Sequence, residues 1–460
     1  MTDLADQPLS PLDGRYRIAT APLAVHLSEA GLNRARVRVE VEWLLALTDA
    51  GVAGTSPLDD SQRDALRRIV DGFGAADVAE LAGHEAVTRH DVKAVEYYLR
   101  DRLAALGLGD LAELVHFACT SEDINNLAVA TTVQTAVREV WVPALDGVVE
   151  RLRGLALRWA EAPMLARTHG QPATPTTMGK ELAVFVHRLA RLRERVLAVE
   201  ITGKANGASG DFAAHVVAAP EIDWQALTKR FVEGLGLAWN PLTTQIESHD
   251  WQVELYGRLE HVGGVLHNLC TDVWMYIAEG YLVQVPQAGA TGSSTMPHKV
   301  NPIRFENAEA NLELAEGVLG TLRRTLVTSR WQRDLTDSTT QRNIGVGLGH
   351  GLVALDNLTR GLGEIELDRD RLLADLDANQ EVLGEAIQTV VRAEIVAGRS
   401  DTANPYELVK ALTRGRRVTA DRMAEFVAGL GLEAEVAARL AALTPAGYTG
   451  LAAELVDHIR

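Results

Sequence analysis

The stretch LYGRLEHVGGVLHNLCTDVWMY, residues 255–276, decides the fold class of this 460-residue chain. Its large apolar residues recur every three or four positions, at Leu255, Leu259, Val262, Leu266, Leu269, Val273 and Tyr276. Residues at that spacing share one face of an α-helix. No proline interrupts the chain between Pro241 and Pro286. We therefore predict a long helix here whose apolar face packs against other helices.

Two further stretches repeat the helical pattern. One contains Leu145, Val148, Val149, Leu152, Leu155, Ala156 and Trp159, and the other contains Leu182, Phe185, Val186, Leu189, Leu192 and Val196. Proline is also absent from Pro57 to Pro143, from Pro175 to Pro220 and from Pro302 to Pro405. Sustained two-residue alternation and strand–helix alternation are both missing, so the sequence favours an all-α bundle.

Composition excludes several classes of protein. A hydrophobic content of 47% supports a large buried core, and a net charge of −17 argues against a partner rich in phosphate, such as nucleic acid or a membrane surface. Cys119 and Cys270 are the only cysteines, too few for a disulfide framework or a Cys-rich zinc site. The first residues lack a signal-peptide pattern, and no apolar run approaches the ~18 residues of a membrane span. We expect a cytoplasmic protein with no nucleic-acid or membrane partner.

The segment GSSTMPHKVNP, residues 292–302, concentrates hydroxyl, imidazole, ammonium and amide groups. Asn301 and Pro302 predict the N-cap and first position of a helix, because residues 305–309 are strong helix formers. A helix N-terminus favours negative charge, which suits an anionic substrate or a serine acting as a base. A plain surface turn is the alternative interpretation.

Six other short segments between the helical stretches are rich in polar groups: residues 10–16, 88–91, 116–126, 167–175, 204–211 and 330–343. Each has a simpler structural explanation, such as a helix cap or a surface ion pair. We expect residues 167–175 to form a loop, with Thr174 and Pro175 capping the start of the following helix. Taken together, the segments suit a polyanionic substrate and proton transfer.

His169 and Ser293 are the best acid–base candidates. An imidazole with an ordinary pKa of ~6.5 can protonate a leaving group near neutral pH. Ser293 would act as a base only with backbone donors, a nearby cation such as Lys299 and exclusion of water. A Ser-His-Asp hydrolase would need a strand–Gly-x-Ser-x-Gly–helix context that is absent. Phosphate-binding Walker loops, dinucleotide-binding glycine turns and His-Glu-x-x-His zinc motifs are absent as well.

The segment GSSTMPHKVNP resembles the signature loop of the fumarase/aspartase superfamily. Five other segments, PLDGRY (11–16), RHDVKAVEY (89–97), CTSEDINN (119–126), RTHGQPATP (167–175) and RWQRDLTDS (330–338), resemble the longer bacterial adenylosuccinate lyases within it. The similarity runs from about residue 10 to the C-terminus. It implies an all-α fumarase/aspartase-like fold in three domains: an N-terminal helical domain at 1–112, a central long-helix bundle at 113–365 and a C-terminal helical domain at 366–460. It also implies a homotetramer whose active sites draw loops from three subunits.

The same resemblance implies a reaction and a set of site residues. Fumarate would be eliminated from adenylosuccinate, leaving AMP, and from the succinylated carboxamide ribotide SAICAR, leaving AICAR, without a cofactor or metal. His169 would be the general acid and Ser293 the general base. Removal of the proton would give a dianionic intermediate, for which Ser294, Lys299, Asn301, Thr120, Ser121 and Gln245 would supply positive charge and hydrogen-bond donors. His90 and Asp91 would lie near the reacting atoms. Phosphate and ribose would be held by Arg15, Tyr16, Arg333, Ser338 and Arg342. Further substrate contacts would come from Thr168, Asn307, Thr339, Thr340, Gln341 and Arg89. Arg89 stands where a bacterial relative has asparagine.

Two alternatives remain at this stage. One is a sibling lyase, such as argininosuccinate lyase, that acts on a substrate without a nucleotide. The arginines at positions 15, 333 and 342 argue against it, because guanidinium groups bind the phosphate of a nucleotide substrate. The other is a non-catalytic structural protein on the same fold, which the intact Ser293, His169 and Lys299 disfavour.

Overall fold

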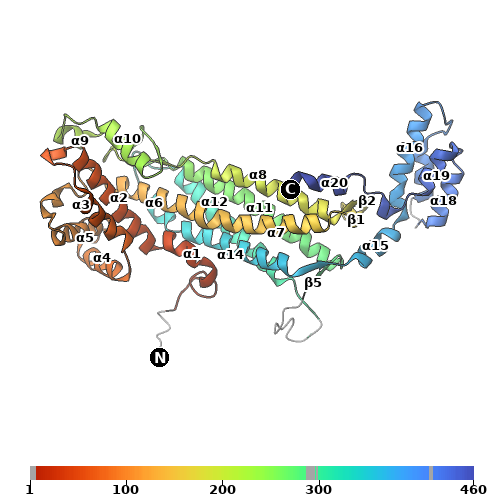
Figure 1. The fold of residues 1–460 in the computed structure, drawn as a ribbon, viewed down its shortest axis with the longest axis horizontal. Coiled ribbons are helices and arrows are strands. Elements are labelled where there is room, and N and C mark those ends of the chain that lie inside the picture. Colours follow the sequence, from red (N-terminus) through yellow and green to blue (C-terminus); the bar gives the residue numbers. More distant parts are fainter. Residues whose placement is uncertain (1–6, 286–295, 297–298, 414–417) are drawn as a thin grey trace. The chain divides into compact units, whose positions relative to one another are not determined.

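The computed structural model describes residues 7–285, 296, 299–413 and 418–460 (Figure 1). The chain forms two compact units. Unit 1 comprises residues 1–145, 192–266 and 308–356, and unit 2 comprises 146–191, 267–307 and 357–460. The division falls within five long helices: α7 (Val142–Arg158), α8 (Met178–Leu197), α11 (Asp250–Ala278), α12 (Ile303–Leu326) and α14 (Ile344–Gly363).

These helices confirm the predicted all-α fold. All the residues of the stripes beginning at Leu145 and Leu182 are buried, and so are those of the stripe beginning at Leu255, except the half-buried Tyr276. The three-domain division at residues 112 and 365 remains a prediction. Among residues 7–285, 296, 299–413 and 418–460, no helix has both the length and the apolar character needed to cross a bilayer.

Unit 1 is built mainly from helices. They are α1 (Arg17–Leu27), α2 (Glu29–Asp49), α3 (Asp60–Asp71), α4 (Ala75–Thr88), α5 (Asp91–Ala105), α6 (Ser121–Ala136), α9 (Ala213–Ala218), α10 (Trp224–Gly234) and α13 (Thr336–Gln341), with 3₁₀ turns η2 (Val52–Gly54) and η3 (Gly109–Leu114) and a short parallel strand pair, β3 (Thr202–Gly203) with β4 (Ala238–Trp239). The buried Trp43 of α2 lies 4.9 Å from Phe231 of α10, measured between ring centroids. A π-helical turn, η4 (Val137–Trp141), joins α6 directly to α7.

Unit 2 contains two antiparallel strand pairs and a set of short helices. The pairs are β1 (Pro163–Thr168) with β2 (Gln171–Thr177), and β5 (Leu282–Gln284) with β6 (Ile365–Leu367). The shorter helices are α15 (Arg369–Asp377), η5 (Gln380–Leu383), α16 (Gly384–Val396), α17 (Pro405–Thr413), α18 (Ala420–Ala428), α19 (Ala434–Ala441), η6 (Pro445–Gly447), α20 (Ala452–Leu455) and η7 (Val456–Ile459). Ile387, Val391, Met423, Val427 and Leu440 form part of their apolar core.

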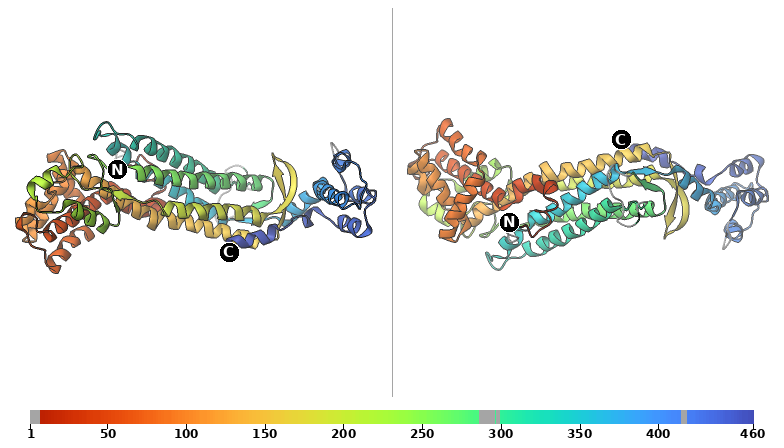
Figure 2. Two further views of the ribbon diagram at one scale, coloured as in Figure 1. Left: turned by 90° about the horizontal axis from the view of Figure 1, so that it is seen from above. Right: turned by 90° about the horizontal axis from the view of Figure 1, so that it is seen from below.

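The prediction for residues 167–175 was wrong in detail. Thr174 and Pro175 lie in β2 rather than at a helix start, and α8 begins only at Met178. Figure 2 shows β1 and β2 as a hairpin, drawn in yellow. The predicted start of α12 was off by one residue, since the helix begins at Ile303 and Pro302 accepts the first helical hydrogen bond, from the N–H of Glu306.

Candidate active site

The N-terminus of α6 is anchored by a buried carboxylate. Asp123 accepts hydrogen bonds from the N–H groups of Thr120 (2.8 Å), Asn206 (3.0 Å) and Gly207 (3.1 Å) and pairs with the Lys204 ammonium at 2.8 Å. The Asp123 and Lys204 side chains are 1% and 0% exposed. Because a buried ion pair needs further hydrogen bonds to offset its desolvation, these contacts fix the start of the helix. Thr120 is the N-cap of α6, and the helix begins at Ser121.

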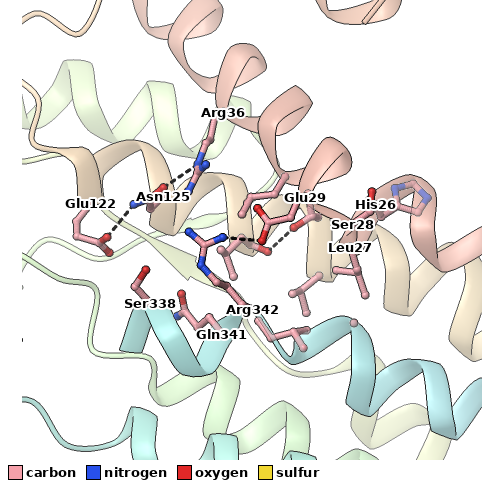
Figure 3. Close-up of a pocket in the computed structure, with 16 residues that line it drawn as sticks. His26, Leu27, Ser28, Glu29, Arg36, Glu122, Asn125, Ser338, Gln341 and Arg342 are labelled. Carbon is pink, nitrogen blue, oxygen red and sulfur yellow. Dashed lines mark hydrogen bonds and ion pairs between the residues drawn. The ribbon is translucent and has the colours of Figure 1, made fainter. Parts of the chain in front are cut away.

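A pocket in unit 1 brings together side chains from α2, α6, α13 and α14 (Figure 3). The buried Arg36 donates from Nε to Asn125 Oδ1 (2.9 Å) and from Nη2 to Asp91 Oδ2 (2.8 Å). Asn125 in turn donates to Glu122 Oε1 at 3.0 Å, and the same oxygen pairs with Arg333 Nη1 at 2.9 Å. The result is a connected network of charge-assisted hydrogen bonds, which are stronger than neutral ones.

Arg342 lines the same pocket together with Ser338 and Gln341. Its guanidinium contacts Glu29 Oε1 at 2.5 Å and Asp91 Oδ2 at 3.4 Å. The hydrogen bond to Glu29 raises the pKa of Arg342, and although burial opposes the shift, the charges of Glu29 and Asp91 add to it. Arg342 is therefore a permanent cation held by carboxylates, and an incoming anion would compete with them.

Asp91 is the carboxylate that two arginines share. Burial raises the pKa of Asp91, but the charge of Arg36, the N–H of Val92 and the charge of Arg342 outweigh it, and the net pKa is lowered. Asp91 thus stays ionised throughout the neutral range. It orients both guanidiniums and leaves the other faces of Arg342 for a ligand.

A second hollow, of about 300 Å³, adjoins Arg342 and Glu29. This hollow is lined by Ser10, Leu12 and Asp13. The turn before α1 therefore lies beside the pocket that Arg36 and Arg342 line, which we call the arginine pocket. Arg15 in that turn is exposed, and the half-buried Tyr16 is the N-cap of α1. The predicted phosphate-binding residues Arg15, Tyr16 and Arg342 therefore belong to one region of unit 1.

The other predicted residues of unit 1 lie at element ends. Arg89 ends α4 in the left-handed conformation (φ 54°), and His90 Nδ1 accepts from the N–H of Lys93 at 3.2 Å as the N-cap of α5. Gln245 donates to the carbonyl of Ala208 at 3.0 Å. Thr339 is exposed and Thr340 donates to the carbonyl of Thr336, so α13 uses one of its hydroxyls for its own backbone. These contacts belong to helix ends and loop backbone.

In unit 2, His169 occupies the tip of the β1–β2 hairpin. Thr168 pairs with Gln171, so His169 (φ 53°) and Gly170 (φ 71°) form the two-residue turn, with positive φ at both positions as a type I′ turn requires. Thr168 and His169 are both exposed. Close to the tip of the hairpin, Arg167 pairs with Asp375 of α15 at 2.7 Å and lies near Glu279 at 3.7 Å. The hairpin therefore presents an accessible imidazole on a braced support.

The remaining predicted residues also belong to unit 2. Lys299 is exposed, and Asn301 and Asn307 are half-buried at the start of α12. Ser293 and Ser294 lie outside the described residues. The roles assigned to them therefore remain predictions.

Among the carboxylate, guanidinium and amide side chains that line the pocket, four were not predicted: Glu29, Arg36, Glu122 and Asn125. Arg36 and Glu40 of α2 are both buried, and Glu40 pairs with His116 Nδ1 at 2.6 Å. Charged residues inside a helix usually face solvent, so the sequence carries no local signal that Arg36 and Glu40 are buried.

Only one trio among the described residues has a spacing suited to a metal ion: Glu80, His84 and Asp101, on α4 and α5. Glu80 is already paired with Arg102 at 2.6 Å, and none of the three lines the arginine pocket. The trio therefore receives no role in the site.

Comparison with known proteins defines the class first. The lyase family matches residues 14–317. Two solved structures share the fold: a 3-carboxy-cis,cis-muconate lactonizing enzyme from Pseudomonas putida (TM-score 0.73, 22% identity, 95% of each chain) and a fumarate lyase from Mesorhizobium sp. BNC1 (TM-score 0.74, 18% identity, 95% of this chain and 96% of the other). The protein is an all-α lyase with the fumarase/aspartase-like fold.

More similar relatives narrow the class to one family. The adenylosuccinate lyase C-terminal family matches residues 329–449. Adenylosuccinate lyases from Escherichia coli K12, Vibrio cholerae and Legionella pneumophila strain Corby are 47%, 46% and 43% identical to the chain, over 98%, 98% and 99% of each sequence. The chain belongs to the adenylosuccinate lyase family.

Proposed function

We propose that the chain cleaves adenylosuccinate to AMP and fumarate, and SAICAR to AICAR and fumarate, in purine nucleotide biosynthesis. The observation that carries the proposal is the 47% identity to the Escherichia coli adenylosuccinate lyase over 98% of both chains. The arginine pocket supports it, since Arg342 and Arg333 suit a phosphorylated substrate better than an uncharged one.

The proposed reaction is a β-elimination. Ser293 removes a proton from the succinyl carbon next to a carboxylate, and the electron pair of that C–H bond is first held on this carboxylate as a dianionic intermediate. The same electron pair then forms the new double bond as the C–N bond breaks. His169 protonates the departing nitrogen, so the products are fumarate and the neutral amine of the purine or imidazole. An exposed imidazole at a hairpin tip fits an acid that approaches the substrate from outside.

Around these two groups, the substrate is held by charge. The succinyl and base portions are proposed to be bound by Lys299, Asn301, Asn307, Ser294, Thr120, Ser121, Gln245, His90 and Thr168. The phosphate and ribose are proposed to be surrounded by Arg15, Tyr16, Arg89, Arg333, Ser338, Thr339, Thr340, Gln341 and Arg342. Asp91 is proposed to lie with His90 near the base and leaving group. Preorganised donors of this kind stabilise the dianionic intermediate more than the substrate.

We further propose that the enzyme is a homotetramer in which each active site combines loops from three subunits. We also place it in the cytoplasm, a reducing compartment that suits Cys119 and Cys270, which form no disulfide among the described residues.

The experiment is a substrate panel. Purified protein is offered adenylosuccinate, SAICAR and argininosuccinate separately, and fumarate is measured by ultraviolet absorbance. We expect fumarate from the first two substrates only. Release from argininosuccinate alone would assign the chain to the sibling activity, and no release from any substrate would contradict the proposal.

A further inference from the structure

A buried histidine of unit 1 packs against α13, the short helix that contributes Ser338 and Gln341 to the arginine pocket. The His249 side chain is only 2% exposed. Its Nε2 lies 3.4 Å from Asp337 Oδ2, and its Nδ1 lies 3.4 Å from Gln341 Nε2. One ring therefore reaches the second residue and the last residue of α13.

The surrounding hydrogen bonds define the tautomer of this ring. The Tyr256 hydroxyl donates to Gln252 Oε1 at 3.0 Å, so the amide nitrogen of Gln252 faces His249 Nδ1, at 3.3 Å. Two amide nitrogens, from Gln252 and Gln341, thus converge on Nδ1, which must be the acceptor. The proton then resides on Nε2 and is donated to Asp337.

The backbone of His249 is held as tightly as its ring. It has a φ of 60°, which few residues other than glycine adopt. Its N–H donates to the buried Glu247 at 2.8 Å, and its carbonyl accepts from the N–H groups of Gln252 (3.0 Å) and Val253 (3.1 Å) at the start of α11. A residue held in a sparsely populated conformation by several hydrogen bonds is often functional.

Helix α13 needs such support. A six-residue helix, Thr336–Gln341, is too short to be stable without tertiary contacts. The ring of His249 provides two of these contacts, and Asp337, which accepts from His249, also lies 4.0 Å from Arg333. Figure 3 shows Ser338, Gln341 and Arg342 at the edge of the pocket. A shift of α13 would therefore move all three residues together.

We propose that His249 is a positioning residue for substrate binding. Its ring holds α13 in the one placement that presents Ser338, Gln341 and Arg342 to the phosphate and ribose. The inference rests on the proposed function, because that function supplies the ligand for these three side chains.

Three variants separate the two contacts of the ring. His249→Asn keeps an acceptor at the Nδ1 position and suits positive φ, His249→Gln keeps a donor at the Nε2 position, and His249→Leu removes both. We expect His249→Leu to raise the KM for adenylosuccinate about tenfold or more and to change kcat about threefold or less, because the acid and base are untouched. His249→Asn is expected to stay within about threefold of the wild-type KM, with His249→Gln between the two.

A double-mutant cycle tests whether the effect passes through Gln341. In a Gln341→Ala background, His249→Leu should raise KM about threefold or less, because the shared interaction is already lost. The matched control is His350→Leu, which removes another buried histidine of unit 1, one that contacts Asn311 at 2.9 Å and does not line the pocket. We expect its KM to equal that of the wild type.

Folding is checked by circular dichroism, and AMP affinity is measured by calorimetry on the same proteins. A folded His249→Leu with wild-type KM and AMP affinity would overturn the inference. It would also be overturned if His249→Leu raised KM by the same factor in the wild-type and Gln341→Ala backgrounds. If His249→Leu does not fold, equal AMP affinities of His249→Asn and His249→Gln would overturn it. Failure of the proposed function is distinguishable, since it appears as wild-type protein that releases no fumarate.

Discussion

Arg342 and Arg36 compete for one carboxylate, that of Asp91, at 3.4 Å and 2.8 Å. Arg342 has a second partner in Glu29, whose side chain is 63% exposed. An exposed ion pair contributes little to stability, so Glu29 is the partner that a substrate phosphate would replace most easily. At the scale of single residues, the site therefore contains a carboxylate, Glu29, that competes with a ligand for Arg342.

Glu29→Gln removes the charge of this competitor. We expect the KM for adenylosuccinate to fall roughly two- to fivefold, because less interaction energy must be given up when the phosphate binds Arg342. Steady-state kinetics at low ionic strength provide the measurement, since added salt screens the effect.

The control for this change is Glu42→Gln on the same helix. Glu42 pairs with Arg67 at 2.9 Å and does not line the arginine pocket, so its substitution should leave KM unchanged. An unchanged or raised KM in Glu29→Gln would show that Glu29 does not compete with substrate.

His169 can be tested without disturbing its hairpin. Asn-Gly is the preferred sequence of a type I′ turn, so His169→Asn keeps the geometry that His169 and Gly170 adopt and removes only the imidazole. We expect turnover to fall at least about 100-fold with wild-type affinity for AMP. Turnover within tenfold of the wild type, in a folded variant, would exclude His169 as the general acid.

The polar segments between the long helices contain Asp91, Ser338 and Arg342, and the pocket brings Ser338 and Arg342 together. The roles that the resemblance assigns to these residues remain predictions. Arg36 and Asn125 were missed because they lie inside helices, where polar residues usually face solvent. Their burial follows from the packing of α2 against α6, and tertiary packing of that kind leaves no local signal.

At the scale of elements, α2 is joined to the segment before α6 by a pair formed between the buried Glu40 and the half-buried His116. Burial lowers the pKa of His116, but its hydrogen bond to Glu40 and the charges of Glu40, Glu96 and Asp123 outweigh it, and the net pKa is raised above 6.5. A raised folded-state pKa contributes stability that is complete below the unfolded value. That stability is lost as pH rises through the folded value.

His116→Asn tests this linkage and suits the positive φ of 61° at this position. We expect the free energy of unfolding to fall by about 1–3 kcal/mol at pH 6. The deficit relative to wild type should narrow as pH rises past the raised pKa of His116. Urea unfolding at pH 6 and at pH 9 measures both values, and a deficit that is constant or larger at pH 9 would contradict the assignment.

Elements were predictable in proportion to their length. The stripes of α7, α8 and α11 specify long helices because many residues repeat the same period. The β1–β2 hairpin was missed because Pro163, Pro172 and Pro175 lie within it, and proline is uncommon in strands. Its His-Gly turn is also not one of the frequent type I′ sequences.

At the scale of the whole molecule, the proposed acid and base need not come from the same chain. If each active site combines His169 of one subunit with Ser293 of another, two inactive variants can form an active site together. Mixing His169→Asn with Ser293→Ala, after reversible dissociation, should restore up to about a quarter of the wild-type activity, in proportion to sites that receive both intact residues. Activity no greater than that of the separate variants would exclude shared sites.

Whole-molecule properties were the least accessible to residue patterns. Periodicity predicts helices but does not specify the assembly, because an apolar face can be covered by its own chain or by another copy. The three-domain division and the homotetramer came only from resemblance. A sedimentation measurement of the purified protein tests the assembly directly, with a tetramer expected.

The central claim is that this chain eliminates fumarate from adenylosuccinate. The most direct test mixes purified protein with adenylosuccinate and quantifies both products by chromatography. We predict AMP and fumarate in equal amounts, with product formation abolished in His169→Asn. Adenylosuccinate that remains intact with folded wild-type protein would contradict the account.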